Sequence, residues 1–404
     1  MINCDGPKEF KAEIVQMING DTNPRGPGFI EKAVPGGLNI TVPGRKQVIH
    51  SGSYGYVADC KQLRVESFTL QCWIWPTAPK THPKYWKHGE QALVTKWSGG
   101  KGYGLFLNAK GHVEVRVNGV TLESPKPVRD HAWHFVAATY DAASGELILY
   151  HEPQVHYALD PVIPPVSKTI SEKIEHLPIP AAVAAYAECL SDDPTAQSSV
   201  PAGVVLAGKY NGKIEAPRIC SKALSRQDIE TMKLGAQSGL TERRNSGPTG
   251  ALSEVIVAAW DFSHGIDTIK GKDFGPYRLD LDFVNLPTRG MTGHNWSGTV
   301  FDWKEAPKEY AAISFHDDDI DDARWEVDFE WQVPADCKSR SYAAKLTTAD
   351  GDEDYVPFWV VPEIGKEQSK IAFMVPTISY MAYANEHVAC NAGAAELFIY
   401  RVPI

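Results

Sequence analysis

The sequence lacks the patterns that mark several common classes of protein. Its seven cysteines are scattered and include no CxxC pair, which fits reduced thiols better than a disulfide framework or a zinc site. No run of about 18 apolar residues occurs, so no membrane-spanning helix is predicted. The N-terminus, MINCDGPKEFKAEIVQMING, has no basic start followed by an apolar segment. We therefore predict no signal peptide and a cytoplasmic location.

Positive charge is also scarce. The chain has 40 Lys and Arg against 50 Asp and Glu, a net charge of −10, which disfavours a nucleic-acid partner. No GxSxG, HExxH, phosphate-loop or dinucleotide fingerprint is present. The histidines lack metal-ligand spacing as well, because His131 and His134 lie in a segment predicted to be extended, where they occupy opposite faces.

Short strands with one buried face are abundant between residues 61 and 235. The segment FTLQCWIWP, which begins at Phe68, alternates apolar positions with a period of two, as a half-buried strand does. GYGLFLNAKGHVEVRV contains an Ala-Lys-Gly turn and HFVAATYDAASGELILY a Ser-Gly turn, each between two apolar strands. This pattern predicts an antiparallel sandwich that ends in a helix capped by Ser225.

The rest of the chain is predicted to form further β-rich modules. Shifts in composition and a Gly/Ser-rich linker place the boundaries. The run IAFMVPTISYMAYANEH is more continuously apolar than the other strands, as a buried strand of an α/β sheet is. The predicted division is a β-rich lead-in at 1–60, the sandwich at 61–235, a linker at 236–252, a small immunoglobulin-like β-domain at 253–363 and the incomplete start of an α/β domain at 367–404.

Two sequence features are candidates for ligand binding in the β-rich part. The acidic run Asp317 to Asp322 predicts a solvated or interface loop, with calcium as the alternative, although it lacks the Gly and the final Glu of an EF-hand loop. Aromatic side chains either stack on sugars or fill the core. The aromatic residues in question are Trp73, Trp75, Trp86, Trp97 and Tyr103.

Another candidate lies near the C-terminus. Tyr380 and Tyr383 are predicted to end a buried strand, with Asn385, Glu386 and His387 following. Ligands gather at the carboxyl ends of strands in α/β sheets, and a tyrosinate can hold ferric iron. The alternative is a buried pair of tyrosines with satisfied hydroxyls.

Several of these segments resemble known families. FTLQCWIWP, LVTKW, GYGLFL and WHFVAATYD resemble strands of the laminin-G/concanavalin-like superfamily. The succession of FHDDDIDDARWEVDFEW, SYAAKLTTADGDEDYVPFWVVP and PTISYMAYANEH resembles the large (beta) subunit of N,N-dimethylformamidase.

The second resemblance implies an activity, a cofactor and partners. Members of that family hydrolyse N,N-dimethylformamide, a small amide, to dimethylamine and formate. They use a ferric iron held by two tyrosines and a glutamate in a glutamine-amidotransferase-like domain, in an assembly with a small subunit and further large subunits. Tyr380 or Tyr383 matches the first ligand, Asn385, Glu386 and His387 would lie near the substrate, and the other ligands are expected after residue 404.

The resemblance therefore predicts a truncated large subunit that is inactive alone. Two other hypotheses remain open. The sandwich is a binding module for carbohydrate or protein, because fold alone does not establish function. Alternatively, the β-modules are a scaffold for subunit contacts.

Overall fold

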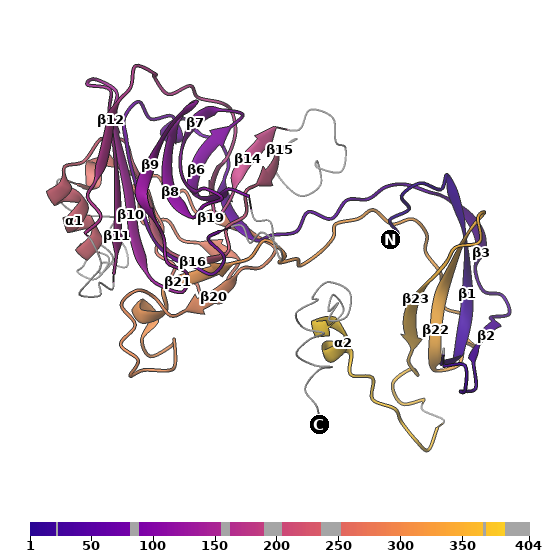
Figure 1. Cartoon of the computed structure of the whole chain (residues 1–404). Coiled ribbons are helices and arrows are strands. Elements are labelled where there is room, and N and C mark those ends of the chain that lie inside the picture. Colours follow the sequence, from indigo (N-terminus) through magenta and orange to yellow (C-terminus); the bar gives the residue numbers. More distant parts are fainter. Residues whose placement is uncertain are drawn as a thin grey trace. The chain divides into compact units, whose positions relative to one another are not determined.

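The computed structural model divides the chain into two compact units, which are described separately (Figure 1). One unit contains residues 49–324, and the other combines residues 1–48 with residues from 325 onward. The structure describes residues 1–21, 23–80, 89–154, 162–189, 204–235, 252–366 and 369–383.

The unit of residues 49–324 is a sandwich of two eight-stranded antiparallel sheets. In the first sheet, strand β5 is hydrogen-bonded between β10 and β16. The order of this sheet is β12 (Val166–Thr169), β11 (Glu146–Pro153), β10 (His134–Asp141), β5 (Phe68–Pro76), β16 (Gly212–Cys220), β21 (Ala312–Phe315) and β20 (Thr288–Met291), with β17 (Ile256–Ala259) also paired to β16.

The second sheet faces the first across the core. Its order is β18 (Lys270–Gly271), β19 (Leu281–Val284), β4 (Tyr54–Val57), β13 (Ala181–Val183), β6 (Gln91–Ser98), β7 (Lys101–Leu107), β8 (His112–Val117) and β9 (Val120–Pro127). A separate hairpin of β14 (Tyr186–Cys189) and β15 (Val204–Ala207) packs on β6. Single turns of 3-10 helix occur at η1 (Lys61–Leu63), η3 (Ser253–Val255) and η4 (Pro307–Tyr310).

Alternating apolar side chains fill the space between the two sheets, as the sequence predicts. Phe68, Leu70 and Ile74 of β5 and Leu105 of β7 are fully buried in one core cluster. The hairpin turns are also where they were expected, with Gly145 at a φ of 72° between β10 and β11. An antiparallel, concanavalin-like sandwich is therefore confirmed.

Helix α1 (Arg226–Gly235) covers the outer face of the first sheet. The predicted cap is present, because Asp228 N donates to Ser225 Oγ at 3.2 Å and Ser225 Oγ donates to Asp228 Oδ2 at 2.7 Å. Ile229 and Met232 are fully buried against Trp73 and other residues of the sheet. The helix thus seals an apolar surface that the sandwich would otherwise expose.

The second unit is built on a single antiparallel sheet. Its order is β2 (Phe29–Ala33), β1 (Glu9–Gly20), β22 (Arg340–Thr348) and β23 (Glu353–Val360), with β3 (Asn39–Pro43) also paired to β1. Helix α2 (Thr377–Tyr383) follows this sheet in the chain. Neither α1 nor α2, the α-helices of the described residues, is long and apolar enough to cross a membrane.

The strand pairing divides the chain differently from the predicted boundaries. Within 253–363, strands β17, β20 and β21 extend the sandwich, whereas β22 and β23 pair with each other and with β1. Residues 1–60 do not form one lead-in, since β1 pairs with β22 and β4 lies inside the sandwich. The physical reason is that period-two alternation identifies a strand but not its distant partner.

Candidate functional site

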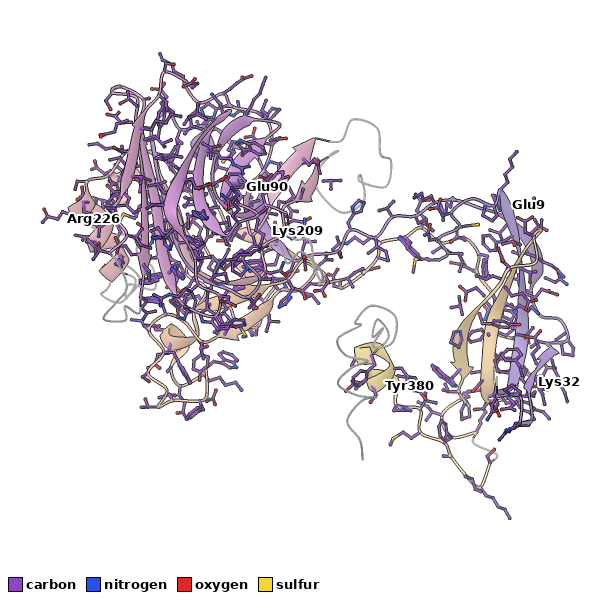
Figure 2. The ribbon with its side chains drawn as sticks, viewed as in Figure 1. Glu9, Lys32, Glu90, Lys209, Arg226 and Tyr380 are labelled. Atoms are coloured by element: carbon purple, nitrogen blue, oxygen red, sulfur yellow. The ribbon has the colours of Figure 1, made fainter. Side chains whose placement is uncertain are left out.

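The predicted iron ligands Tyr380 and Tyr383 lie in a helix, which corrects the prediction that they end a buried strand. Pro376 precedes α2, and proline is favourable at a helix start. Its carbonyl accepts a hydrogen bond from Tyr380 N at 3.1 Å. The ring of Tyr380 stacks on Trp359 of β23 at 6.0 Å. Tyr380 is 51% exposed and Tyr383 is 70% exposed. Figure 2 labels Tyr380 on α2.

The described residues around these tyrosines do not make a complete iron site. Among the described residues, no group of three or more His, Cys, Asp or Glu is placed to hold a metal ion. Asn385, Glu386 and His387 lie outside the described residues. The two tyrosines share one helical face at a spacing of three, so α2 offers at most phenolate ligands. No reaction step through iron is therefore derived.

The acidic run holds together two distant segments of the sandwich unit. Asp319 Oδ2 accepts from Ser53 Oγ at 2.6 Å, and Gly52 N donates to Asp319 O at 2.7 Å. His316 N also donates to Ser53 Oγ, at 3.1 Å. These contacts connect residues 51–53 to the segment after β21, so the run includes an interface loop, which is one of the predicted alternatives.

The aromatic residues considered for sugar binding have different positions. Tyr103 is fully buried in the core and Trp73 is 6% exposed, so neither presents a free ring face. Trp75 and Trp97 are half-buried, and Trp86 lies outside the described residues. The core interpretation is therefore correct for Trp73 and Tyr103.

An open groove of about 910 Å³ lies beside α1 on the outer face of the first sheet. Trp73 and Tyr150 provide its aromatic lining, and Glu152 provides a carboxylate. Arg226 and Lys233 of α1 provide two cations. Figure 2 labels Arg226 on this helix. Aromatic walls with a few polar groups are typical of ligand pockets.

Charge at the rim of this groove is balanced, because Glu230 of α1 adds a second carboxylate, 2.7 Å from Arg226 and 3.6 Å from Lys233. Glu152 pairs with Arg226 at 2.5 Å and with Lys233 at 2.6 Å. The guanidinium of Arg226 also lies 5.2 Å from the ring centre of Tyr150, and the ammonium of Lys233 lies 5.6 Å from that of Trp73. These contacts fix the rim of the groove by ion pairing and cation–π attraction.

His294 covers the ring of Trp73. The two rings stack at 4.2 Å with 13° between their planes. Gln154 Nε2 donates to His294 O at 2.6 Å, so the loop after β20 is attached to the end of β11. Sequence reasoning missed His294, because nothing near it marks a loop that folds back over the sheet.

A buried pair of histidines was also missed. His134 of β10 and His151 of β11 are connected by an Nδ1–Nε2 distance of 3.0 Å. One neutral tautomer set satisfies both rings: His151 Nδ1 donates to Ser124 Oγ, His134 Nδ1 donates to His151 Nε2, and Arg129 N donates to His134 Nε2. Burial lowers the pKa of His134 to about 4 and that of His151 to about 3. The folded sandwich therefore holds both imidazoles in their neutral form at neutral pH.

Lys209 is a further residue with unusual chemistry. Its ammonium lies 4.2 Å from the ring centre of Tyr54 and donates to the carbonyl of Leu206. Burial lowers the pKa of Lys209 to about 7, well below the usual value for a lysine. Lys209 is labelled in Figure 2.

The fold and these surfaces define the class of the first module. Residues 50–152 match the model of the Concanavalin A-like lectin/glucanases superfamily. The solved structure of the CBM40 module of the Ruminococcus gnavus IT-sialidase is also similar. The match covers 46% of this chain and 96% of the CBM40 chain, at 16% identity and a TM-score of 0.31. That likeness is too weak for a functional conclusion.

Residues 288–400 match the model described as N,N-dimethylformamidase beta subunit-like, C-terminal. Over 98% of its length the chain is 30% identical to the N,N-dimethylformamidase beta subunit of Alcaligenes sp and 31% identical to that of Paracoccus aminophilus. It spans about half, 51%, of the length of each. The resemblance to this subunit is thus confirmed over nearly the whole chain, including the segments from Phe315 onward that suggested it.

Proposed function

We propose that this chain is part of the large subunit of an amidohydrolase related to N,N-dimethylformamidase, acting on a small amide in the cytoplasm. The observation that carries the proposal is the identity of about 30% along 98% of the chain. This similarity extends over both structural units. If the chains shared only a lectin-like module, the similarity would cover the sandwich alone.

Within this proposal, Tyr380 or Tyr383 supplies a phenolate to ferric iron. Bound iron would polarise the amide carbonyl or activate water. The exposure of both tyrosines on α2 supports a site completed by groups from other segments. We further propose that the chain alone is inactive, and that a small subunit and further large subunits are its partners.

The test compares the chain alone with a completed assembly. The chain is fused to the remaining half of the Paracoccus aminophilus beta subunit and co-expressed with the small subunit. We expect iron in the purified assembly and release of dimethylamine from N,N-dimethylformamide, and neither from the chain alone. A folded assembly that holds no iron and releases no dimethylamine would contradict the proposal.

Two matched variants then identify the ligand. Tyr380→Phe and Tyr383→Phe each remove one hydroxyl and keep the ring. We expect one of them to weaken and shift the visible tyrosinate-to-iron absorption band, since one tyrosinate ligand remains, and the other to leave the band unchanged. If both variants keep the band and the iron, neither tyrosine is a ligand.

A second candidate function is recognition of a carbohydrate or protein by the sandwich. The groove beside α1 favours this candidate, because it is open and its lining includes the polar groups of Glu152, Arg226 and Lys233. Calorimetry of the full chain against a glycan panel tests the carbohydrate form. Saturable heat that Arg226→Gln abolishes would support it, whereas no heat from any glycan would exclude it for that panel.

A further inference from the structure

A second recess lies on the outer face of the first sheet, next to the loop that carries His294. Its lining includes Glu215 and Arg218 of β16, Asp261, Ala311 and His294. A bulge in β16 places two of these side chains together. Glu215 pairs with Trp73 and Arg218 with Gln71, so two residues of β16 lie opposite one residue of β5 between these pairs. The bulge therefore turns Glu215 and Arg218 to the same face.

Arg218 is a buried cation with few partners. The residue is 6% exposed, and its one hydrogen bond to a described residue runs from Nη1 to Met232 O at the end of α1. No carboxylate of the described residues forms an ion pair with it. Burial lowers the pKa of its guanidinium. Most of its donors therefore have no acceptor among the described residues and are left to water or to a ligand.

The two carboxylates that line the recess are held by other groups. Glu215 Oε2 accepts from His294 N at 2.7 Å and lies 2.9 Å from His294 Nδ1. Asp261 Oδ1 accepts from Ser263 N at 3.0 Å and from Ser263 Oγ at 2.6 Å. The hydrogen bond of Glu215 joins β16 to the loop after β20, and those of Asp261 stay within its own loop. Both carboxylates attract the guanidinium of Arg218, but neither accepts a hydrogen bond from it.

Unsatisfied polar atoms gather around the recess. His294 Nδ1 makes no aligned hydrogen bond although its side chain is only 5% exposed. Asn295 Oδ1, also in the lining, is buried without a hydrogen-bond partner. Buried unsatisfied groups in a native fold call for an explanation. A bound anion can accept from His294 Nδ1, whereas Asn295 Oδ1 is an acceptor and needs a donor such as water.

We propose that this recess binds a small carboxylate through the guanidinium of Arg218. A planar carboxylate matches the fork of an arginine and accepts two parallel hydrogen bonds. The space inside is about 40 Å³, and one water occupies about 10–15 Å³ of such space. The volume therefore suits an anion of three or four heavy atoms, such as formate or acetate, better than a larger oxyanion.

Calorimetric titration of the full chain with sodium acetate, with sodium chloride at matched ionic strength as the blank, tests the proposal. We expect one saturable site for acetate, and weaker binding of sulfate because it is larger. Arg218→Gln should weaken acetate binding about tenfold or more, since it removes a charge-assisted hydrogen-bond donor. Arg64→Gln is the matched control, because it removes an exposed arginine that lines neither the recess nor the groove, and it should leave binding unchanged.

Because Arg218 also holds the end of α1, a second variant keeps the test decisive if Arg218→Gln unfolds. Ala311→Leu narrows the recess and keeps Arg218 in the chain, and it should abolish acetate binding with an unchanged circular dichroism spectrum. The proposal is overturned if acetate gives no saturable heat up to tens of millimolar, which would leave only water in the recess. It is also overturned if acetate binds equally well to Ala311→Leu, or if sulfate binds as tightly as acetate.

Discussion

The two units bury apolar side chains to very different degrees. They are the sandwich of residues 49–324 and the unit of residues 1–48 and 325 onward, the sheet unit. In the sandwich, two sheets face each other and side chains such as Leu70 and Leu105 are fully buried. In the sheet unit, a single sheet forms two small clusters around Phe10 and Ile14. Many of its large apolar side chains remain exposed, among them Val356, Val361, Ile364, Ile371, Phe373, Met374 and Ile378.

The difference shows what a second layer contributes. A sheet has two faces, and each apolar face needs a covering layer. In the sandwich each sheet covers the inner face of the other, and α1 covers part of the outer face of the first sheet. The sheet unit has Phe329 and Trp331 over part of one face. Exposed apolar surface of this extent marks an interaction surface, which agrees with the proposed role as a subunit.

Substitution in the two units should give the largest contrast. Leu70→Ala in β5 should lower the free energy of unfolding of the sandwich by about 3–5 kcal/mol, because it leaves a cavity in a closed core. Ile378→Ala in α2, where the side chain is 83% exposed, should change stability by less than about 0.5 kcal/mol. Hydrogen exchange of the β5 and α2 amides measures both. Equal effects would mean that exposure in the sheet unit does not report on its packing.

Acid should destabilise the sandwich selectively through His134 and His151. Burial holds the pKa of His134 at about 4 and that of His151 at about 3, below the usual value of about 6.5. The unfolded chain then binds more protons, so the stabilisation is complete above pH 6.5 and is lost as the pH falls through 6.5 toward 4.

Between pH 7 and pH 5 the free energy of unfolding should fall by about 2 kcal/mol for each histidine. Hydrogen exchange of the β10 amides measures this fall. The double variant His134→Gln, His151→Gln should flatten this dependence, while His131→Gln, at an exposed position, should not. A slope that survives the double variant would assign the acid sensitivity to other groups.

A smaller effect is expected where the acidic run meets residues 51–53. Ser53→Ala removes a buried hydroxyl that donates to Asp319 and accepts from His316 N. Leaving these two groups unsatisfied should cost the sandwich about 1–3 kcal/mol. Ser51→Ala is the matched control, because Ser51 is exposed and its hydroxyl donates only to Asp317 O among the described residues. The measurement is exchange of the β4 and β21 amides, and similar protection in both variants would contradict the expected contribution.

Sequence reasoning succeeded where structure is local. Alternation identified β5 and its neighbours, and the Ser225 cap identified the start of α1, because both depend on residues a few positions apart. It failed where the partner is distant, as in the pairing of β1 with β22. The apolar run before Tyr380 was also interpreted as a strand. A short apolar segment has no periodicity that distinguishes strand from helix, and here Pro376 starts a helix.

The smallest predicted effect concerns how α2 is held in the sheet unit. A helix of seven residues is too short to be stable without tertiary contacts, and Tyr380 stacks on Trp359 at 6.0 Å. Trp359→Ala should therefore weaken protection of the α2 amides by about 0.5–1.5 kcal/mol, the usual value of an aromatic pair. Tyr383→Phe keeps the ring at a largely exposed position and should leave protection unchanged. If Trp359→Ala has no effect, the stack does not position α2, and Tyr380 is no better fixed than Tyr383 for any role as a ligand.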